Sequence, residues 1–209
     1  MSEQISTAPA GSKRYRSIDI VSMGPIIFLV VMIAGFSIAA PKYFPTAENL
    51  VTILNDGALL AILACGLTLV LIAGEFDVSI ASIASFAGAE ATVLVTKLNW
   101  AIAPTILVVI LTALVCGLIN GALITGLRIH ALIATIGTAS LLDGGTLWIT
   151  GNSVIFSGFT DELIWCGSWR LFGLQAPVYS LIVIAAITAF MLRYTTTGRH
   201  LYAIGGNRG

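Results

Sequence analysis

Residues 57–89 read GALLAILACGLTLVLIAGEFDVSIASIASFAGA, an apolar tract interrupted once, at 74–79, by Gly-Glu-Phe-Asp-Val-Ser. A helix needs about 20 apolar residues to cross the hydrocarbon layer of a membrane. The two arms, extended by their flanking residues, therefore predict two membrane helices that meet at the interruption. From the spacing alone, the interruption is either a solvated turn or a break that dips into the membrane. In the second case, freed backbone groups and the two carboxylates would line a polar cavity.

The composition places the whole chain in a membrane. Hydrophobic residues make up 57% of the 209 residues, and charged residues make up 10%, against about 25% in an ordinary soluble domain. Too few polar side chains remain to cover the surface of a soluble fold of this size. Ten basic and ten acidic residues give a formal net charge of zero, which argues against nucleic acid as a partner.

The stretches between consecutive charged residues predict an all-α membrane protein with about six transmembrane helices. The predicted spans are 20–40, 50–73, 78–96, 101–125, 130–150 and 176–192. With the N-terminus in the cytoplasm, most basic residues fall on the cytoplasmic side, in agreement with the positive-inside rule. The cytoplasmic ones are Lys13, Arg14, Arg16, Arg128, Arg193, Arg199 and Arg208, and the outer ones are Lys42, Lys97 and Arg170. Residues 1–17 are expected to form a flexible cytoplasmic tail, and 18–209 the transmembrane domain.

No sequence feature indicates catalysis, a metal site or a cofactor. The three cysteines are odd in number and widely spaced, so they form neither a disulfide framework nor a zinc-ligand pattern. The two histidines, His130 and His200, lie far apart in the chain. Neither a phosphate-binding loop nor a dinucleotide-binding glycine pattern occurs, so the chain is not expected to hydrolyse a nucleotide.

Polar residues in or beside the spans are candidates for a translocation pathway, because such groups usually face a bundle interior or water. The candidates are Glu75, Asp77, Ser79, Asn120, Thr135, Thr138 and Asp143. Asp143 is the deepest carboxylate and is expected to make an interior polar contact. Asp56 and Glu90 lie closer to the outer ends of their spans, where exposure to headgroups is expected. For Asn120, lining of the pathway and hydrogen bonding between helices both stay open.

Two groups of glycines have separate predicted roles. Gly117 and Gly121 form a G-x-x-x-G pattern, which lets two helices approach closely in a membrane. The glycine-rich stretch at 198–207 is predicted to be a basic loop on the cytoplasmic side. Its members of interest are Gly198, Arg199, Gly205, Gly206 and Asn207.

Three ordered stretches resemble the membrane permease subunit of ribose-type (monosaccharide) ABC importers. Residues 66–82, GLTLVLIAGEFDVSIAS, are similar to the family segment G-x-T-x-V-x-x-x-G-x-x-D-L-S-x-G-S. Asn120-Gly121, with Leu-Arg-Ile at 127–129 and Ile-Ala-Thr-Ile-Gly-Thr at 133–138, resembles N-G … L-R-I-P-P-F-I-A-T-L-G-T. Residues 197–207, TGRHLYAIGGN, resemble F-G-R-x-L-Y-A-I-G-G-N. Together they cover the chain from about residue 50 to its end.

The chain departs from the family pattern at three positions. His130 stands where the family usually has proline, Asp143 where arginine is common, and Ala81 where glycine is usual. The family also continues beyond the Gly-Gly-Asn segment into a coupling segment and further helices. The resemblance therefore implies about the first two-thirds of a permease, truncated on the C-terminal side in a cytoplasmic loop.

The resemblance implies an inner-membrane permease subunit of an ATP-driven, binding-protein-dependent sugar importer, which forms the translocation pathway. It implies a multi-pass protein of the bacterial plasma membrane. The implied partners are a second permease subunit (identical or different), ATP-binding subunits facing the loop at 198–207, a periplasmic sugar-binding protein and membrane lipid. The embedded carboxylates leave an ion-coupled secondary transporter or channel as one alternative, and an inactive truncated remnant is another. The sequence does not identify the sugar.

Overall fold

The structure, a computed structural model, describes residues 20–206. The predicted tail at 1–17 and Asn207 lie outside the described residues. The chain divides into two units, one ending at Leu50 and the other beginning at Val51. Helices dominate both units, so the predicted all-α membrane class is confirmed.

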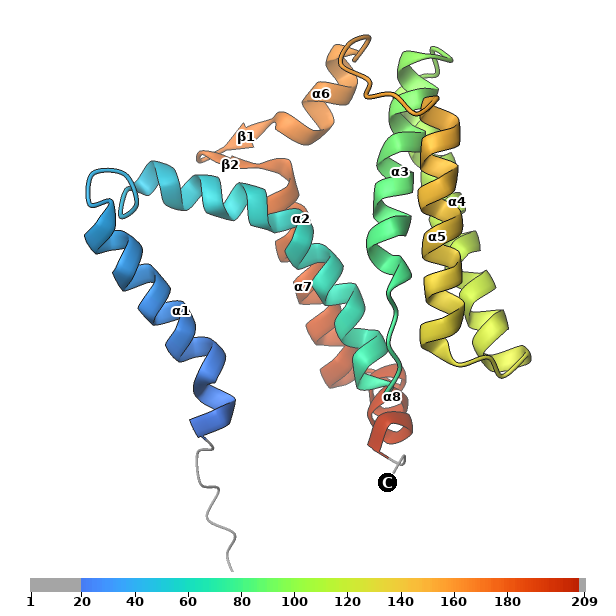
Figure 1. Ribbon diagram of the computed structural model, residues 1–209, viewed down its shortest axis with the longest axis horizontal. Coiled ribbons are helices and arrows are strands. Elements are labelled where there is room, and N and C mark those ends of the chain that lie inside the picture. Colours follow the sequence, from blue (N-terminus) through green and yellow to red (C-terminus); the bar gives the residue numbers. More distant parts are fainter. Residues whose placement is uncertain (1–19, 207–209) are drawn as a thin grey trace, which may run out of the picture. The chain divides into compact units, whose positions relative to one another are not determined.

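Helices lie at all six predicted spans (Figure 1). Five are long and apolar enough to cross a membrane: α2 (Ala47–Ile72), α3 (Ser79–Thr96), α4 (Ile102–Gly121) with its extension η1 (Ala122–Gly126), α5 (Ala131–Thr150) and α7 (Ala176–Tyr194). The sixth is α1 (Ile20–Ala39), whose described apolar stretch, Met23–Ala39, is shorter. The remaining elements are the helix α6 (Asp161–Ser168), the strands β1 (Arg170–Leu171) and β2 (Leu174–Gln175), and the helix α8 (Thr196–Gly206).

In the first unit, residues in the turn after α1 form contacts that stabilise the start of α2. The rings of Phe36 and Phe44 stack with their centroids 5.3 Å apart. The Thr46 hydroxyl oxygen accepts a hydrogen bond from the Asn49 backbone N–H at 3.2 Å, and the Asn49 side chain donates to the Phe44 carbonyl at 2.8 Å. Thr46 therefore caps α2, because it satisfies one of the N–H groups that lack a partner in the first turn of a helix.

In the second unit, α3, α4 and α5 pack side by side (Figure 1). The buried side chains of α5 are small and recur every three or four residues, which places them on one helix face. They are Ala131, Ala134, Thr135, Thr138 and Ala139. Small side chains allow close helix approach in a membrane, where no hydrophobic effect drives the association. This face packs α5 against α3 and α4.

The connection from α4 to α5 contains a π-helical turn and a capped helix start. η1 continues α4 with wider winding, and the Thr125 hydroxyl donates to the Gly121 carbonyl at 2.7 Å. His130 precedes α5 with φ −58° and ψ 131°, and its Nδ1 accepts from the Leu132 N–H at 3.3 Å. The φ angle lies in the range that a proline ring imposes. His130 thus has a φ angle that a proline could also adopt, and its imidazole caps α5.

The predicted outer loop, 151–175, contains the short helix α6 and a two-stranded antiparallel hairpin. Trp169 stacks on Tyr179 of α7 with ring centroids 5.4 Å apart, and the Tyr179 hydroxyl donates to the Leu171 carbonyl at 2.5 Å. The Gln175 N–H donates to the Asn55 side-chain oxygen of α2 at 2.8 Å. The hairpin is thus tied to both α7 and α2.

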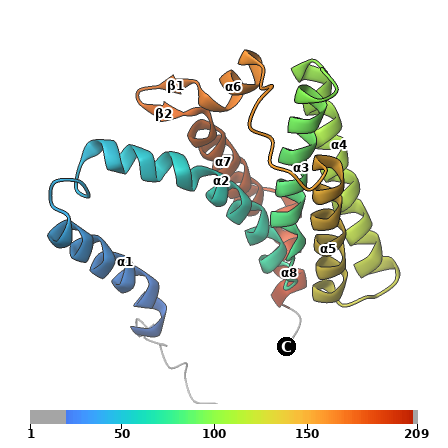
Figure 2. The same ribbon diagram turned by 45° about the horizontal axis from the view of Figure 1, so that its top comes forward.

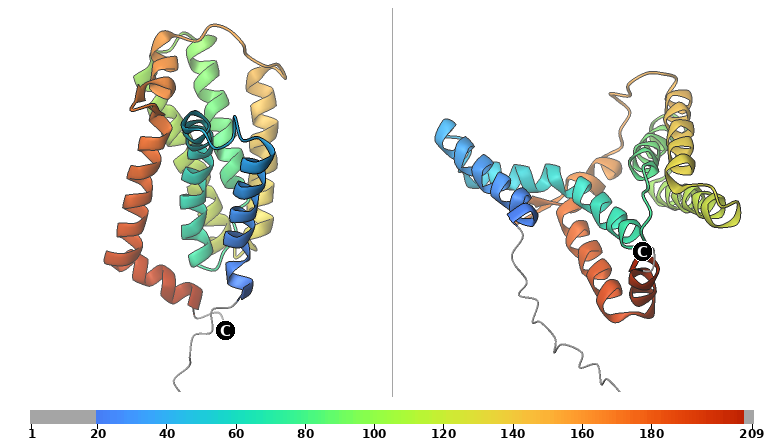
Figure 3. Two further views of the ribbon diagram at one scale, coloured as in Figure 1. Left: turned by 90° about the vertical axis from the view of Figure 1, so that its left-hand side faces the viewer. Right: turned by 60° about the horizontal axis from the view of Figure 1, so that its bottom comes forward.

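Residues 196–206 form the helix α8 where the sequence predicted a loop. α8 leaves α7 at an angle and reaches the end of α2 (Figures 2 and 3). Two glycines permit this packing. A Cβ atom at Gly198 would collide with the backbone of Met191 and Leu192, and one at Gly205 would collide with the carbonyl of Ile72. The glycines that suggested a loop instead allow close contact between helices.

The contact at Gly205 can be tested with Gly205→Ala. The added methyl group has no room beside the Ile72 carbonyl, so α8 must move away from α2. We expect the free energy of unfolding to fall by about 1–3 kcal/mol, as for other overpacked sites, in an SDS titration of the protein in mixed micelles. Gly206→Ala is the matched control, because no heavy atom lies within 4 Å of the added Cβ. Equal stability of the two variants would contradict the packing of α8 on α2.

Candidate functional site

The interruption at 74–79 ends α2 with a Schellman motif. Gly74 has φ 79°, a left-handed conformation that favours glycine. The Gly74 N–H donates to the Leu71 carbonyl at 2.9 Å, and the Glu75 N–H donates to the Val70 carbonyl at 3.1 Å. Both bonds satisfy carbonyl groups in the last turn of α2. The helix therefore ends because Gly74 can adopt a conformation that other residues rarely adopt.

Between Gly74 and the start of α3 at Ser79, residues 75–77 form no regular secondary structure, and Val78 has φ −87° and ψ −19°. This segment runs past the end of α2 to the first turn of α3 (Figure 1). The Val78 N–H donates to the Thr135 hydroxyl oxygen of α5 at 3.3 Å, and Thr135 is only 1% exposed. A backbone group outside regular structure has thus found its partner on a neighbouring helix. This geometry differs from that of a solvated turn, in which water would satisfy such groups.

A chain of hydrogen bonds links the start of α3 to α4 and α5. Asp77 Oδ1 accepts from both the backbone N–H and the hydroxyl of Ser79, each at 2.7 Å. Asn120 Nδ2 of α4 donates to the Ser79 hydroxyl oxygen at 2.8 Å. The Thr138 hydroxyl of α5 donates to Asn120 Oδ1 at 2.5 Å. Ser79 is fully buried, Asn120 is 4% exposed and Thr138 is 9% exposed.

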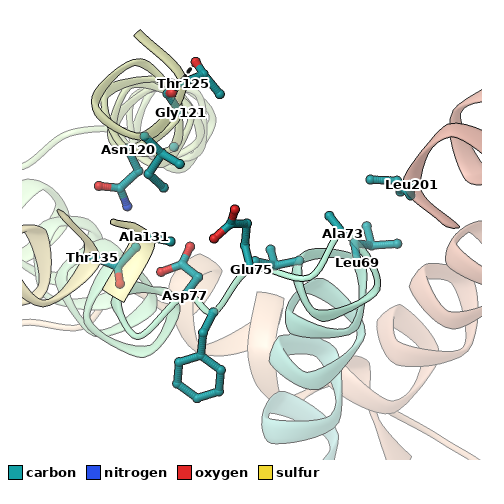
Figure 4. A pocket seen from close by; sticks show the side chains of 14 residues that line it. Leu69, Ala73, Glu75, Asp77, Asn120, Gly121, Thr125, Ala131, Thr135 and Leu201 are labelled. Atoms are coloured by element: carbon teal, nitrogen blue, oxygen red, sulfur yellow. Dashed lines mark hydrogen bonds between the residues drawn. The ribbon is translucent and has the colours of Figure 1, made fainter. Parts of the chain in front are cut away.

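A cavity of about 340 Å³ opens beside this chain of hydrogen bonds. It lies between the end of α2, residues 75–77, the end of α4 with η1, the start of α5, and α8. The carboxyl groups of Glu75 and Asp77 point toward the space between these elements (Figure 4). The polar lining residues are Glu75, Asp77, Asn120, Thr125 and Thr135, and the apolar ones include Leu69, Val70, Ala73, Phe76, Ile124, Ala131 and Leu201.

The structure brings together most of the predicted pathway residues. Of the seven, Glu75, Asp77, Asn120 and Thr135 line the cavity, and Ser79 and Thr138 belong to the hydrogen-bond chain. Asp143 does not join them, because it is exposed on α5 outside this cavity. The apolar contributions of α2, η1 and α8 were not predicted. No pattern within those stretches indicates that they converge on one space.

Gly117 and Gly121 line the cavity as well. The predicted close approach of a second helix is not found among residues 20–206, because a Cβ atom at either glycine would have no heavy atom within 4 Å. In this chain the two missing side chains leave one wall of the cavity open. The predicted helix packing at Gly117 and Gly121 stays a prediction.

Glu90 was expected near headgroups at an outer helix end, and this expectation is wrong. Its carboxylate lies between α3 and α4, where Oε1 accepts from the Thr112 hydroxyl at 3.0 Å. The other oxygen, Oε2, is buried and has no hydrogen-bond partner among the described residues. Glu90 is not a lining residue of the cavity near Asp77.

The cavity wall combines hydrogen-bonding groups with apolar surface. Carboxylates accept hydrogen bonds, while amides and hydroxyls can donate or accept them. Apolar side chains in the same wall can contact the carbon skeleton of a bound molecule, as in other small-molecule sites. Interrupted helices of this kind are also found at the substrate sites of membrane transporters.

Comparisons with known proteins identify the family. Residues 49–209 match the family described as the branched-chain amino acid transport system / permease component, and the chain belongs to this family. It is 34% identical over 202 residues to the ribose import permease protein RbsC of Escherichia coli (strain K12). The matched region covers 95% of this chain and 62% of that protein. The predicted resemblance to ribose-type permeases is therefore confirmed.

Two further relatives carry other substrate names. The L-arabinose ABC transporter permease protein AraH of Azospirillum brasilense is 30% identical over 184 residues, with 88% of this chain and 53% of that protein covered. The autoinducer 2 import system permease protein LsrC of Escherichia coli O9:H4 (strain HS) is 32% identical over 183 residues, with 87% and 52% covered. The chain thus spans between half and two thirds of the length of these relatives. No solved structure matches it.

Proposed function

We propose that this chain is part of an inner-membrane permease subunit of an ATP-driven, binding-protein-dependent importer of sugars or related polyols. The observation that carries the proposal is the cavity beside the break between α2 and α3. There Asp77 bonds to Ser79 of α3, and Asn120 of α4 links Ser79 to Thr138 of α5. Irregular backbone at membrane depth is tolerated where it is buried in protein or lines a water-filled cavity. The broken segment is therefore the proposed wall of the translocation pathway.

The chemistry of the wall supports a neutral, hydroxyl-rich solute. Glu75 and Asp77 supply acceptors, Thr125 and Thr135 supply hydroxyls, and Phe76 supplies apolar surface. Two relatives are named for import of ribose and L-arabinose, which are neutral and carry several hydroxyl groups. The same relatives favour an ATP-driven importer over the ion-coupled transporter considered from the sequence. Asp143 remains a pathway candidate on α5, outside the cavity.

The outer face of α8 is the proposed contact with an ATP-binding subunit. The less exposed face of α8 carries Gly198, Leu201 and Gly205. The opposite, exposed face carries Arg199 and Tyr202. Leu201 also lines the cavity. One helix thus lies between the proposed ATPase surface and the proposed pathway. The other proposed partners are a second permease subunit, identical or different, and a periplasmic sugar-binding protein, all at the bacterial plasma membrane.

Asp77→Asn in the assembled transporter tests the pathway role. Asparagine keeps an oxygen that can accept from Ser79, so the fold is retained while the carboxylate charge is lost. We expect uptake of the transported sugar to fall by about tenfold to a hundredfold, the rate equivalent of a hydrogen bond to a charged group. Radiolabelled sugar uptake measures this, with Asp56→Asn as the matched control, because Asp56 is exposed on α2. Uptake at the wild-type rate by the Asp77→Asn protein would remove Asp77 from the pathway.

The orientation of the chain can be tested with its own cysteines. Cys166 is exposed on α6, which the six-span topology places outside, whereas Cys65 and Cys116 lie within α2 and α4. We expect a membrane-impermeant thiol reagent to label Cys166 in intact spheroplasts. In a Cys166→Ser protein that also carries Ala203→Cys on the exposed side of α8, labelling should require opening of the membrane. Labelling of Ala203→Cys in intact spheroplasts would overturn both the topology and the ATPase contact.

A further inference from the structure

The polarity of the hydrogen-bond chain around Asp77 follows from the carboxylate. An ionised carboxylate only accepts hydrogen bonds, so the Ser79 hydroxyl must donate its single proton to Asp77 Oδ1. The Ser79 oxygen is then an acceptor, and the Asn120 amide nitrogen donates to it. Asn120 Oδ1 in turn accepts from Thr138. Every bond in the series therefore points from α5 toward Asp77.

Asn120 and Asp77 differ in burial and in how many of their polar atoms have protein partners. Asn120 is 4% exposed, and its amide nitrogen and oxygen both bond to protein side chains. Asp77 is only half-buried, and its two hydrogen bonds both end on Oδ1. Among residues 20–206, Oδ2 has no hydrogen-bond partner. Asp77 can therefore present a carboxylate oxygen without a protein partner to the cavity, while each polar atom of Asn120 already has one protein partner.

We propose that Thr138, Asn120 and Ser79 are positioning residues, which fix the direction of the Asp77 carboxylate and do not themselves bind the solute. This inference rests on the proposed function, in which Asp77 lines the translocation pathway. Thr138 is the most remote member and touches Asp77 only through Asn120 and Ser79. Its hydroxyl should matter through the orientation of Asp77.

Three substitutions on α5 test this role. Thr138→Val keeps the side-chain shape and removes the donor, and Thr138→Ser keeps the donor. Thr146→Val is the matched control, because among residues 20–206 the Thr146 hydroxyl bonds only the Leu142 carbonyl of its own helix, at 2.9 Å. Each protein is placed in lipid nanodiscs, and its infrared spectrum is compared with that of the same protein carrying Asp77→Asn. The difference isolates the carboxylate stretching band of Asp77 without requiring transport.

We expect Thr138→Val to shift the infrared band of Asp77, because Asn120 and Ser79 then lose the hydrogen bond from Thr138 that orients them toward Asp77 Oδ1. We expect Thr138→Ser and Thr146→Val to leave the band unchanged. An unmoved band in Thr138→Val, or an equal shift in Thr146→Val, would overturn the positioning role. If Thr138→Val does not accumulate in the membrane, Ser79→Ala replaces it, since it removes the hydroxyl between Asn120 and Asp77. An unmoved band in Ser79→Ala would overturn the proposal in the same way.

Uptake by the assembled transporter separates this inference from the proposed function. We expect Thr138→Val to slow sugar uptake by up to about tenfold, the equivalent of one lost hydrogen bond, and Thr138→Ser to restore it. A shifted band without any sugar uptake by the unmodified transporter would contradict the proposed function and support the positioning of Asp77. Normal uptake by a Thr138→Val protein with an unmoved band would contradict the positioning and leave the proposed function intact.

Discussion

The structure around the cavity depends on how the chain satisfies its hydrogen bonds where it leaves helical geometry between α2 and α3. In the hydrocarbon layer of a membrane, no water can hydrogen-bond to an unpaired backbone N–H or C=O group. Each such group costs several kcal/mol of free energy. This chain ends α2 with a left-handed glycine, bonds the Val78 N–H to Thr135 of α5, and bonds the Ser79 N–H to Asp77. The broken segment is stabilised by these local bonds at its two ends and by the bond to α5.

The same arrangement explains why a cavity lies at this place. Non-helical residues bound the cavity here, and Gly117 and Gly121 on α4 add no side chains to the space beside them. The polar groups that stabilise the break are the groups that line or support the wall. Under the proposed function, one set of residues would both stabilise the break and contact the solute. α8, which reaches the end of α2 through Gly205 and the cavity through Leu201, forms a neighbouring boundary.

Much of this architecture could be predicted from the sequence, because charge interrupts hydropathy at the ends of the spans and at Glu75 and Asp77. Hydropathy does not show which face of a helix meets which neighbour. The pairing of Thr138 with Asn120 and the burial of Glu90 against Thr112 were therefore beyond prediction. The glycine-rich stretch of α8 was wrongly predicted as a loop, since glycine usually weakens a helix. In α8, the close contacts of Gly198 with α7 and of Gly205 with α2 favour a packed helix instead.

The central claim is that the broken segment faces a water-filled pathway used by the solute. The most direct test is the rate at which a small charged thiol reagent modifies a cysteine at Glu75 in an otherwise cysteine-free transporter. Leu141→Cys on the exposed face of α5 is the reference, because Leu141 is 78% exposed in this chain and lies on a membrane-length apolar helix. We predict that the reagent modifies Glu75→Cys faster than Leu141→Cys. We also predict that modification of Glu75→Cys slows while the sugar is being transported. Equal rates at the two positions, unchanged by the sugar, would contradict it.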